Sequence, residues 1–195
     1  MWPILGCSVV ALAIFLERLW GLRREKVLPG AFLNQVEDLI KREKMLEAMA
    51  LCRQYDSPIA RIVLMGIKNF GKKREVLKER IEEVGRKEAA TLGRFVEVLG
   101  TIANVSTMFG LLGTIQGLII IFSVISQQAV VHPPSLAHGI SVALYTTAFG
   151  LSVAIPTIIA HRYLTGRVDY LVLQMEEISI EMMEYLKEKE EIQLP

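Results

Sequence analysis

The sequence lacks charge over a long stretch, and this absence says more about the protein than its composition does. No Lys, Arg, Asp or Glu occurs in the 64 residues between Glu97 and Arg162. At the chain's mean density of charged residues, a stretch of that length would hold about 14 of them. One charged side chain at the centre of a bilayer costs about 2.5–3.5 kcal/mol, so this stretch indicates a lipid environment and argues against a water-soluble protein.

The residues that carry catalysis or bind metals are also scarce. The sequence contains only two cysteines, Cys7 and Cys52, far apart and outside any CxxC spacing, so neither a disulfide nor a metal site is expected. No GxSxG, HExxH or Walker motif occurs, and His132, His138 and His161 all lie near predicted membrane interfaces, where histidine is common. We therefore predict no enzyme and no cofactor. The net charge of +1 gives no reason to expect a nucleic-acid partner.

The uncharged stretch is too long for one membrane helix, because about 20 residues cross the hydrocarbon core. Polar residues and prolines interrupt it at Gln127–Gln128 and at 132–135. We predict a second transmembrane helix over 96–126, a periplasmic loop over 127–137 and a third transmembrane helix over 138–162. Pro156 lies inside the third helix, where membrane helices tolerate it.

An apolar run at the beginning of the sequence predicts the first transmembrane helix, over 1–22. The alternative is a secretory signal peptide, which needs positive charge before its apolar core and a small-residue cleavage site after it. In this sequence Arg18, Arg23, Arg24 and Lys26 follow the apolar run, and no cleavage pattern is present. We therefore favour a membrane span.

The basic residues predict the orientation. Residues 23–94 contain 17 Lys and Arg against 11 acidic residues, and the loop at 127–137 contains neither. The positive-inside rule then places a helical domain at 23–95 in the cytoplasm, together with a C-terminal helix at 163–195. We expect a multi-pass membrane protein with its N-terminus outside and its C-terminus in the cytoplasm.

Several signals predict helices in the cytoplasmic parts. Ser57 followed by Pro58 is typical of a helix N-cap with proline at the first helical position. A helix that begins near Arg74 would run for about 50 residues, through the second span. In the tail, apolar residues repeat at steps of three and four, namely Leu164, Val168, Leu171, Met175, Ile178, Met182 and Tyr185. This pattern fits either a coiled coil or a single amphipathic helix packed on its own cytoplasmic domain.

Small and hydroxyl-bearing residues recur along one face of each helix of the predicted hairpin. They are Gly100, Ala103, Thr107, Gly110, Thr114 and Gly117 in the first helix, and Ala143, Thr147, Gly150, Ala154 and Thr157 in the second. Small residues let helix backbones approach closely in lipid. We assign helix packing to Gly110, Gly117, Ala143, Gly150 and Ala154.

Two threonines on these faces are predicted at the same depth in the membrane. Thr114 lies 13 residues before Gln127 and Thr147 lies 13 residues after Pro134, so both are expected about 20 Å from the hairpin tip. If several copies of the chain surround a channel, Thr114 and Thr147 would form a polar ring that lines it. Thr146 is expected to face elsewhere and to bond a carbonyl of its own helix.

At these residues the sequence resembles the ExbB/TolQ branch of the MotA/TolQ/ExbB proton channel family. The resemblance rests on GLLGTIQG at 110–117, LAHGISVALYTTAFGL at 136–151 and AIP at 154–156. WPILGCS at 2–8 and LERLW at 16–20 are also similar to the opening span of ExbB-like proteins. The resemblance therefore extends over nearly the whole chain.

The resemblance implies an all-α protein of the bacterial inner membrane, with a periplasmic N-terminus and a cytoplasmic C-terminus. Its three transmembrane helices would extend into a cytoplasmic helical domain, and it would assemble as a homo-oligomeric ring, a pentamer. The implied partners are an ExbD- or TolR-like single-span protein with a membrane aspartate and a TonB- or TolA-like protein. Such a complex uses the proton motive force to energise envelope processes such as TonB-dependent import. Thr114 and Thr147 correspond to the pore-facing threonines of the family.

Two positions depart from the family's pattern. Ser106 and Thr107 stand where an Ala-Pro pair often precedes GLLGT, and Val142 stands where some ExbB proteins have a glutamate. Both departures weaken any claim about a specific hydration path.

Several alternatives stay open at this point. One is a TolQ-like subunit of a Tol-type envelope-maintenance system, and another is a passive structural membrane ring. A solute transporter would need polar substrate-binding groups near the midplane, and a flagellar-stator subunit has four spans, whereas three are predicted here.

Overall fold

The computed structural model describes residues 2–127 and 133–193, and every regular element among them is a helix. The helices are α1 (Trp2–Gly21), α2 (Arg24–Val27), α3 (Gly30–Lys41), α4 (Met45–Gln54), α5 (Pro58–Lys68), α6 (Arg74–Gln127) and α7 (Pro133–Gln193). Three of them, α1, α6 and α7, are long and apolar enough to cross a membrane. The predicted all-α fold with three membrane helices is therefore confirmed.

The chain divides into two compact units. The first, which we call the membrane unit, comprises residues 1–18 and 95–164, and the second, the helical domain, comprises 19–94 and 165–195. Both α6 and α7 contribute to both units, because neither helix is interrupted. Helix α6 begins at Arg74 and extends over 54 residues, as the sequence predicted. Pro156 lies inside α7 without ending it.

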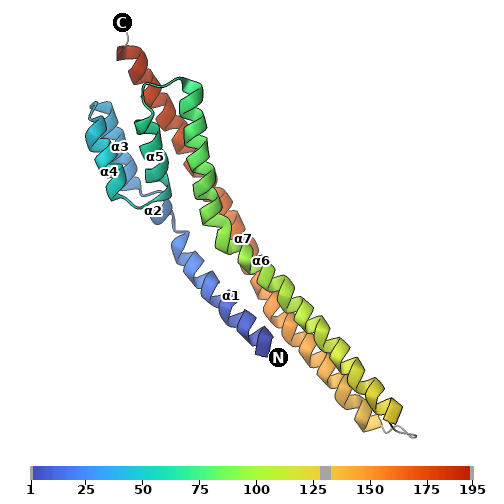
Figure 1. The fold of residues 1–195 in the computed structure, drawn as a ribbon. Helices are drawn as coiled ribbons and strands as arrows, with labels where there is room; N and C mark the ends of the chain where they lie inside the picture. Colours follow the sequence, from blue (N-terminus) through green and yellow to red (C-terminus); the bar gives the residue numbers. More distant parts are fainter. Residues whose placement is uncertain (1, 128–132, 194–195) are drawn as a thin grey trace. The chain divides into compact units, whose positions relative to one another are not determined.

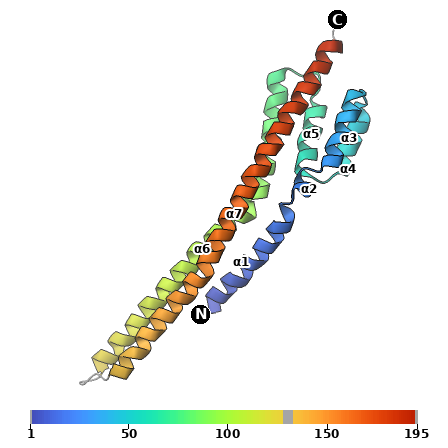
Figure 2. The same cartoon turned by 180° about the vertical axis from the view of Figure 1, so that it is seen from behind.

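In the membrane unit, α6 and α7 lie side by side and run in opposite directions, as both views show (Figures 1 and 2). Helix α7 begins at Pro133, within the segment predicted as loop, because proline is favoured at the first position of a helix. The rest of that loop, at 128–132, lies outside the described residues. Large apolar side chains such as Phe122, Leu144 and Ile159 are more than 60% exposed, and lipid would cover them in a membrane.

The helical domain has a conventional apolar core. Phe32, Val36 and Ile59 are fully buried, and the ring of Phe32 lies 4.9 Å from that of Tyr55. The predicted N-cap of α5 is confirmed, because the hydroxyl of Ser57 accepts a hydrogen bond from the backbone N–H of Ala60 at 3.3 Å. These contacts need no lipid, which agrees with the high charge content of this part of the sequence.

The apolar seam of α7 packs within its own chain. This agrees with the interpretation of the tail as a single amphipathic helix packed on its own helical domain. Its buried positions are Leu164, Val168, Leu171, Met175, Ser179, Met182, Met183 and Leu186, whereas Ile178 is half-buried and Tyr185 is 38% exposed. The predicted seam was therefore wrong at Ile178 and Tyr185. Because positions 164, 175 and 186 lie 11 residues apart, the seam follows the period of an almost straight helix and not the heptad of a left-handed coiled coil.

Candidate functional site

The surface that α6 presents to α7 in the membrane unit consists almost entirely of small residues. Its buried positions recur at steps of four and three, and beyond Leu99 they are Ala103, Ser106, Gly110, Gly113 and Gly117. None of these side chains is larger than that of serine. The absence of bulk lets the two helix backbones approach more closely than an ordinary pair of apolar helices.

The backbones of α6 and α7 lie close together at Gly110 and Gly150. A Cβ atom added at Gly150 would lie 2.8 Å from both the Cα of Gly110 and the carbonyl oxygen of Ser106. One added at Gly110 would lie 3.4 Å from the Cα atoms of Gly150 and Thr147. The atoms in the way belong to the backbone, so a side chain at Gly150 could be accommodated only if the helices separated.

Towards the hairpin tip, each glycine of α6 faces a particular residue of α7. A Cβ atom at Gly113 would overlap the side chain of Thr146, and one at Gly117 would lie 2.6 Å from the Cβ of Ala143 and from the carbonyl oxygen of Gly139. Gly139 is in turn covered by Ile121. The small residues therefore interlock over about three turns of each helix.

The hydroxyl of Thr147 forms a hydrogen bond between the two helices. It lies 3.2 Å from the carbonyl oxygen of Gly110 on α6 and 3.1 Å from that of Ala143 on its own helix. In contrast, Thr114 donates to the carbonyl oxygen of Leu111 at 2.6 Å, within its own helix. Thr147 thus forms a hydrogen bond to α6, whereas the half-buried Thr114 has no hydrogen bond to α7 among the side chains that the structure describes.

Thr114 and Thr147 lie at similar depths. Gly110 faces Thr147 and Gly113 faces Thr146, so the two threonines are separated along the helix axis by no more than about one turn. Their surroundings differ, however. Thr114 directly follows the buried Gly113, and a step of one residue turns a side chain by about 100° around the helix.

The positions assigned to helix packing lie at or next to this contact. Gly110, Gly150 and Ala154 are buried, Gly117 is buried against Ala143, and Ala143 is half-buried. Gly100 lies against the ring of His161, whose Nε2 atom is 3.2 Å from the position of a glycine Cβ. Thr107, by contrast, is exposed and donates to the carbonyl oxygen of Ala103.

Sequence reasoning missed Ser106, Gly113 and Thr146. The prediction that Thr146 faces elsewhere was wrong, because its side chain covers Gly113, although its hydroxyl does bond the carbonyl oxygen of Val142 in its own helix at 2.6 Å. Small residues recur with a heptad repeat at positions 103, 106, 110, 113 and 117 of the sequence. This repeat would have identified Ser106 and Gly113 as contact residues. Ser106 is fully buried and its hydroxyl has no partner among the described residues.

The helical domain contains the main electrostatic contact of the chain. The guanidinium of Arg61 on α5 donates to both carboxylate oxygens of Glu88 on α6, each at 2.7 Å, and to Asp56 at 2.6 Å. The hydrogen bonds to Glu88 raise the pKa of Arg61 above its ordinary value, although burial acts in the opposite direction. This pair fixes α5 against α6 and performs no chemistry that we can identify.

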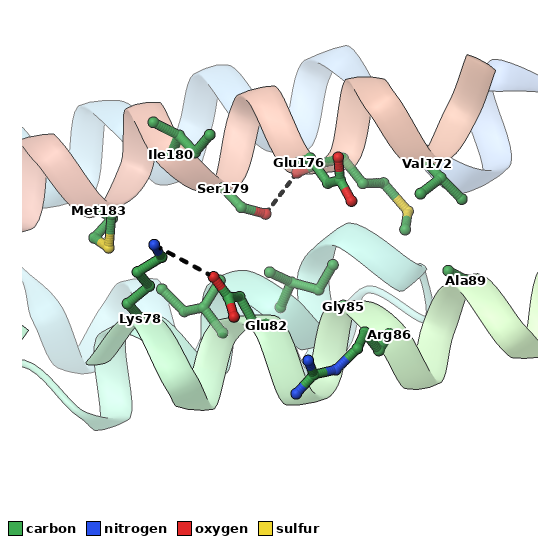
Figure 3. A pocket seen from close by; sticks show the side chains of 13 residues that line it. Lys78, Glu82, Gly85, Arg86, Ala89, Val172, Glu176, Ser179, Ile180 and Met183 are labelled. Atoms are coloured by element: carbon green, nitrogen blue, oxygen red, sulfur yellow. Dashed lines mark hydrogen bonds and ion pairs between the residues drawn. The ribbon is translucent and has the colours of Figure 1, made fainter. Parts of the chain in front are cut away.

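The helical domain also contains a cavity of about 490 Å³ between α6 and α7, beside Ile62 of α5 (Figure 3). Gly85 lines it, and a Cβ atom added there would meet no atom within 4 Å. Most of its lining is apolar, and Lys78 and Glu82 form an ion pair of 3.7 Å at one end. Among the described residues, no cluster of His, Cys, Asp and Glu has the arrangement of a metal site.

Comparison with known proteins supports a membrane role. Residues 54–177 match the model of the MotA/TolQ/ExbB proton channel family. A putative biopolymer transport protein ExbB homolog of Methanothermobacter thermautotrophicus is 32% identical over 84% of this chain and 58% of its own length. A putative ExbB-like 3 protein of Synechocystis is 32% identical over 80% of this chain and 76% of its own length. A Tol-Pal system protein TolQ of Haemophilus influenzae is 27% identical over 85% and 78%. The chain thus spans little more than half the length of the first of these relatives.

Proposed function

Because this chain belongs to the MotA/TolQ/ExbB proton channel family, within its ExbB/TolQ-like branch, we propose that it is a motor subunit driven by the proton motive force. Its task would be to energise an envelope process such as TonB-dependent import. It would act as a homo-oligomeric ring, a pentamer, around a single-span partner of the ExbD or TolR type. A TonB- or TolA-like protein would carry the force onward.

One observation supports this proposal above the others: the hairpin contains no carboxylate. Between Glu97 and Arg162 there is no acidic residue, so the hairpin has no acid of its own to carry protons through the membrane core, and Glu17 of α1 lies in the last part of that helix. A proton pathway then requires a titrating group from another chain. A single-span partner with a membrane aspartate would supply it.

The threonines are the residues of this chain best suited to meet that aspartate. Thr114 is half-buried and lies outside the packed contact between α6 and α7, so it remains open to a further helix. Thr147 donates to Gly110 and Ala143, while the lone pairs of its oxygen can still accept a hydrogen bond. We assign Thr114 direct contact with the partner carboxylate or its water, and Thr147 a position in the same pathway.

The proposed topology follows from the distribution of charge. The helical domain, whose sequence contains most of the Lys and Arg residues, would lie in the cytoplasm, and the hairpin tip and N-terminus would lie in the periplasm. One proton that crosses about 100 mV releases about 2.3 kcal/mol, which is enough to bias the position of a partner helix within the ring.

Proton-dependent activity of Thr→Val variants tests the proposal. The Thr114→Val variant, assayed with its partner, should lose at least about tenfold in activity, because valine keeps the shape and removes a hydrogen bond to a charged group. The Thr147→Val variant should also lose activity. The control is Thr101→Val, which removes an exposed hydroxyl that donates to the backbone carbonyl oxygen of Glu97 in its own helix. Unchanged activity of both Thr114→Val and Thr147→Val would refute the role of the threonines.

Copurification tests the partner. A small single-span protein with a membrane aspartate should purify with this chain. Replacing that aspartate of the partner by asparagine should abolish proton transport. A Tol-type role is the alternative. Whether the complex binds a TolA-like or a TonB-like protein would distinguish the two roles. Activity that persists when the membrane potential is dissipated would instead favour a passive structural ring.

A further inference from the structure

The segment that follows the first membrane helix contains basic side chains that no acidic group neutralises. Arg23, Arg24 and Lys26 are all exposed, and Glu25 is the only acid among residues 19–27. Within the part of the chain that the structure describes, none of these three cations forms an ion pair. Charges left unpaired at the end of a membrane span are available to a ligand.

An exposed aromatic side chain lies beside these cations. Trp20, in the last turn of α1, is 64% exposed, and the guanidinium of Arg23 lies 5.5 Å from its ring. Tryptophan is favoured at the level of lipid headgroups, because its ring is apolar and its N–H is a hydrogen-bond donor. The ring and the cation together offer an apolar and a positively charged surface at one place.

The backbone beneath this surface is held in place. Leu22, Val27 and Leu28 are buried, so the apolar side of the segment packs within the helical domain and the basic side remains outside. The carbonyl oxygen of Leu22 accepts a hydrogen bond of 3.3 Å from Nε of Arg167 on α7. The guanidinium of Arg167 therefore adds a positive charge next to the segment. We call Trp20, Arg23, Arg24, Lys26 and Arg167 the basic patch.

We propose that the basic patch binds the headgroup of an anionic phospholipid. A lipid phosphate accepts hydrogen bonds in the fork geometry that arginine offers, and its acyl chains would lie along the exposed apolar residues of α1, such as Leu16 and Leu19. Clusters of Lys and Arg next to a membrane helix are typical of such sites. The inference goes beyond the proposed motor function and requires only that α1 spans the membrane.

The chain contains two tryptophans, and this makes a site-specific test possible. In the Trp2→Phe variant, Trp20 is the only tryptophan. The purified full-length variant is reconstituted into phosphatidylcholine bilayers that contain, at equal mole fraction, either brominated phosphatidylcholine or brominated phosphatidylglycerol. The bromine lies on the acyl chain and quenches tryptophan fluorescence at short range, so a soluble phosphate compound gives no signal.

We expect the anionic lipid to be preferred at Trp20 by about fivefold or more, which is the effect of one engaged cation near an anionic lipid. Neutralising the patch with Arg23→Gln, Arg24→Gln and Lys26→Gln should reduce the preference to nearly one. The matched control removes three exposed cations elsewhere in the helical domain, with Arg53→Gln, Lys68→Gln and Lys73→Gln, and should keep the preference.

A second control tests whether the preference is local. The Trp20→Phe variant retains Trp2, at the opposite end of α1, and should show no preference between the two lipids. Equal quenching of Trp20 by both lipids would overturn the proposal, as would a preference that survives the triple neutralisation or occurs equally at Trp2. None of these measurements requires the partner protein, so the lipid site and the motor function can fail independently.

Discussion

Replacing Gly150 by alanine should destabilise the membrane unit, because backbone atoms of α6 lie directly against Gly150 of α7. The added Cβ would lie 2.8 Å from the Cα of Gly110 and from the carbonyl oxygen of Ser106. Carbon atoms in good contact are about 3.5–4.0 Å apart, so the helices would have to separate by about 0.7 Å or more. Both obstacles are backbone atoms and cannot rotate away.

The separation would also affect the hydrogen bond of Thr147. Its hydroxyl lies 3.2 Å from the carbonyl oxygen of Gly110, and a further 0.7 Å, by the estimate above, would break this bond. Overpacking costs about 1–3 kcal/mol, and a hydrogen bond between membrane helices contributes about 0.6 kcal/mol. The better helix propensity of alanine returns at most about 1 kcal/mol. We therefore expect a net loss of about 1–3 kcal/mol in the free energy of unfolding.

Gly166 provides the matched control, because it lies on the same helix and a Cβ added there would meet no atom within 4 Å. The Gly166→Ala variant should be unchanged or stabilised by up to about 1 kcal/mol. Both variants are purified in detergent and unfolded by titration with sodium dodecyl sulfate, with helicity followed by circular dichroism. If Gly150→Ala proves as stable as Gly166→Ala, the contact between α6 and α7 is not as close as the structure describes.

Three further predictions concern the helical domain. Glu88→Ala should lower the free energy of unfolding by about 1–3 kcal/mol, because the carboxylate of Glu88 is 9% exposed and its removal leaves Arg61 with the exposed carboxylate of Asp56 as its partner. In contrast, Glu83→Ala, at an exposed pair, should cost less than about 0.5 kcal/mol. Gly71→Ala should cost about 1 kcal/mol, because φ of Gly71 is +80°. Burial raises the pKa of the Cys52 thiol to about 11, so maleimide should label Cys52 at pH 8 only after unfolding.

Each of these has its own measurement. Thermal unfolding in detergent compares the stabilities of the two glutamate variants. An equal loss of stability in both would show that the Arg61–Glu88 pair contributes no more than an exposed ion pair. The same assay compares Gly71→Ala with Gly85→Ala, which is helical and faces open space, and a stabilised Gly71→Ala would contradict the role of the left-handed turn. For Cys52, the unfolded thiol ionises near pH 9 and the folded one only near 11, so burial of the thiol stabilises the fold below pH 9 and less as the pH rises towards 11. Rapid labelling of the folded Cys7→Ser variant at pH 8 would show that Cys52 is accessible.

The membrane spans were predictable because the free-energy cost of placing a charged side chain in lipid applies to each residue separately. The gap between Glu97 and Arg162 predicts two helices from composition alone, and Ser57–Pro58 predicts the start of α5 from local hydrogen bonding. The motifs GLLGTIQG and ALYTTAFGL indicate the family, because they can be read from the sequence without any knowledge of the fold.

The packing faces were predictable only to within one residue. Spacing indicated a row of small residues on α6, but it placed Thr107 in the contact, where the structure has Ser106, and it placed Thr146 outside. In the tail, spacing chose Ile178 and Tyr185 where Ser179 and Leu186 are buried. A polar residue such as Ser106 or Ser179 gives no apolar signal, so its burial is visible only once the opposing surface is present.

The sequence by itself determined that this protein is helical and membrane-spanning, and that its hairpin contains no acid, because these properties follow from the solvation of single residues and from local backbone preferences. Only the tertiary structure decided which side of each long helix is covered. A helix turns by about 100° per residue, and its rotation about its own axis depends on how two surfaces fit. For this reason the hydroxyl of Thr147 forms a hydrogen bond to the opposite helix, while that of Thr114 donates to Leu111 of its own helix.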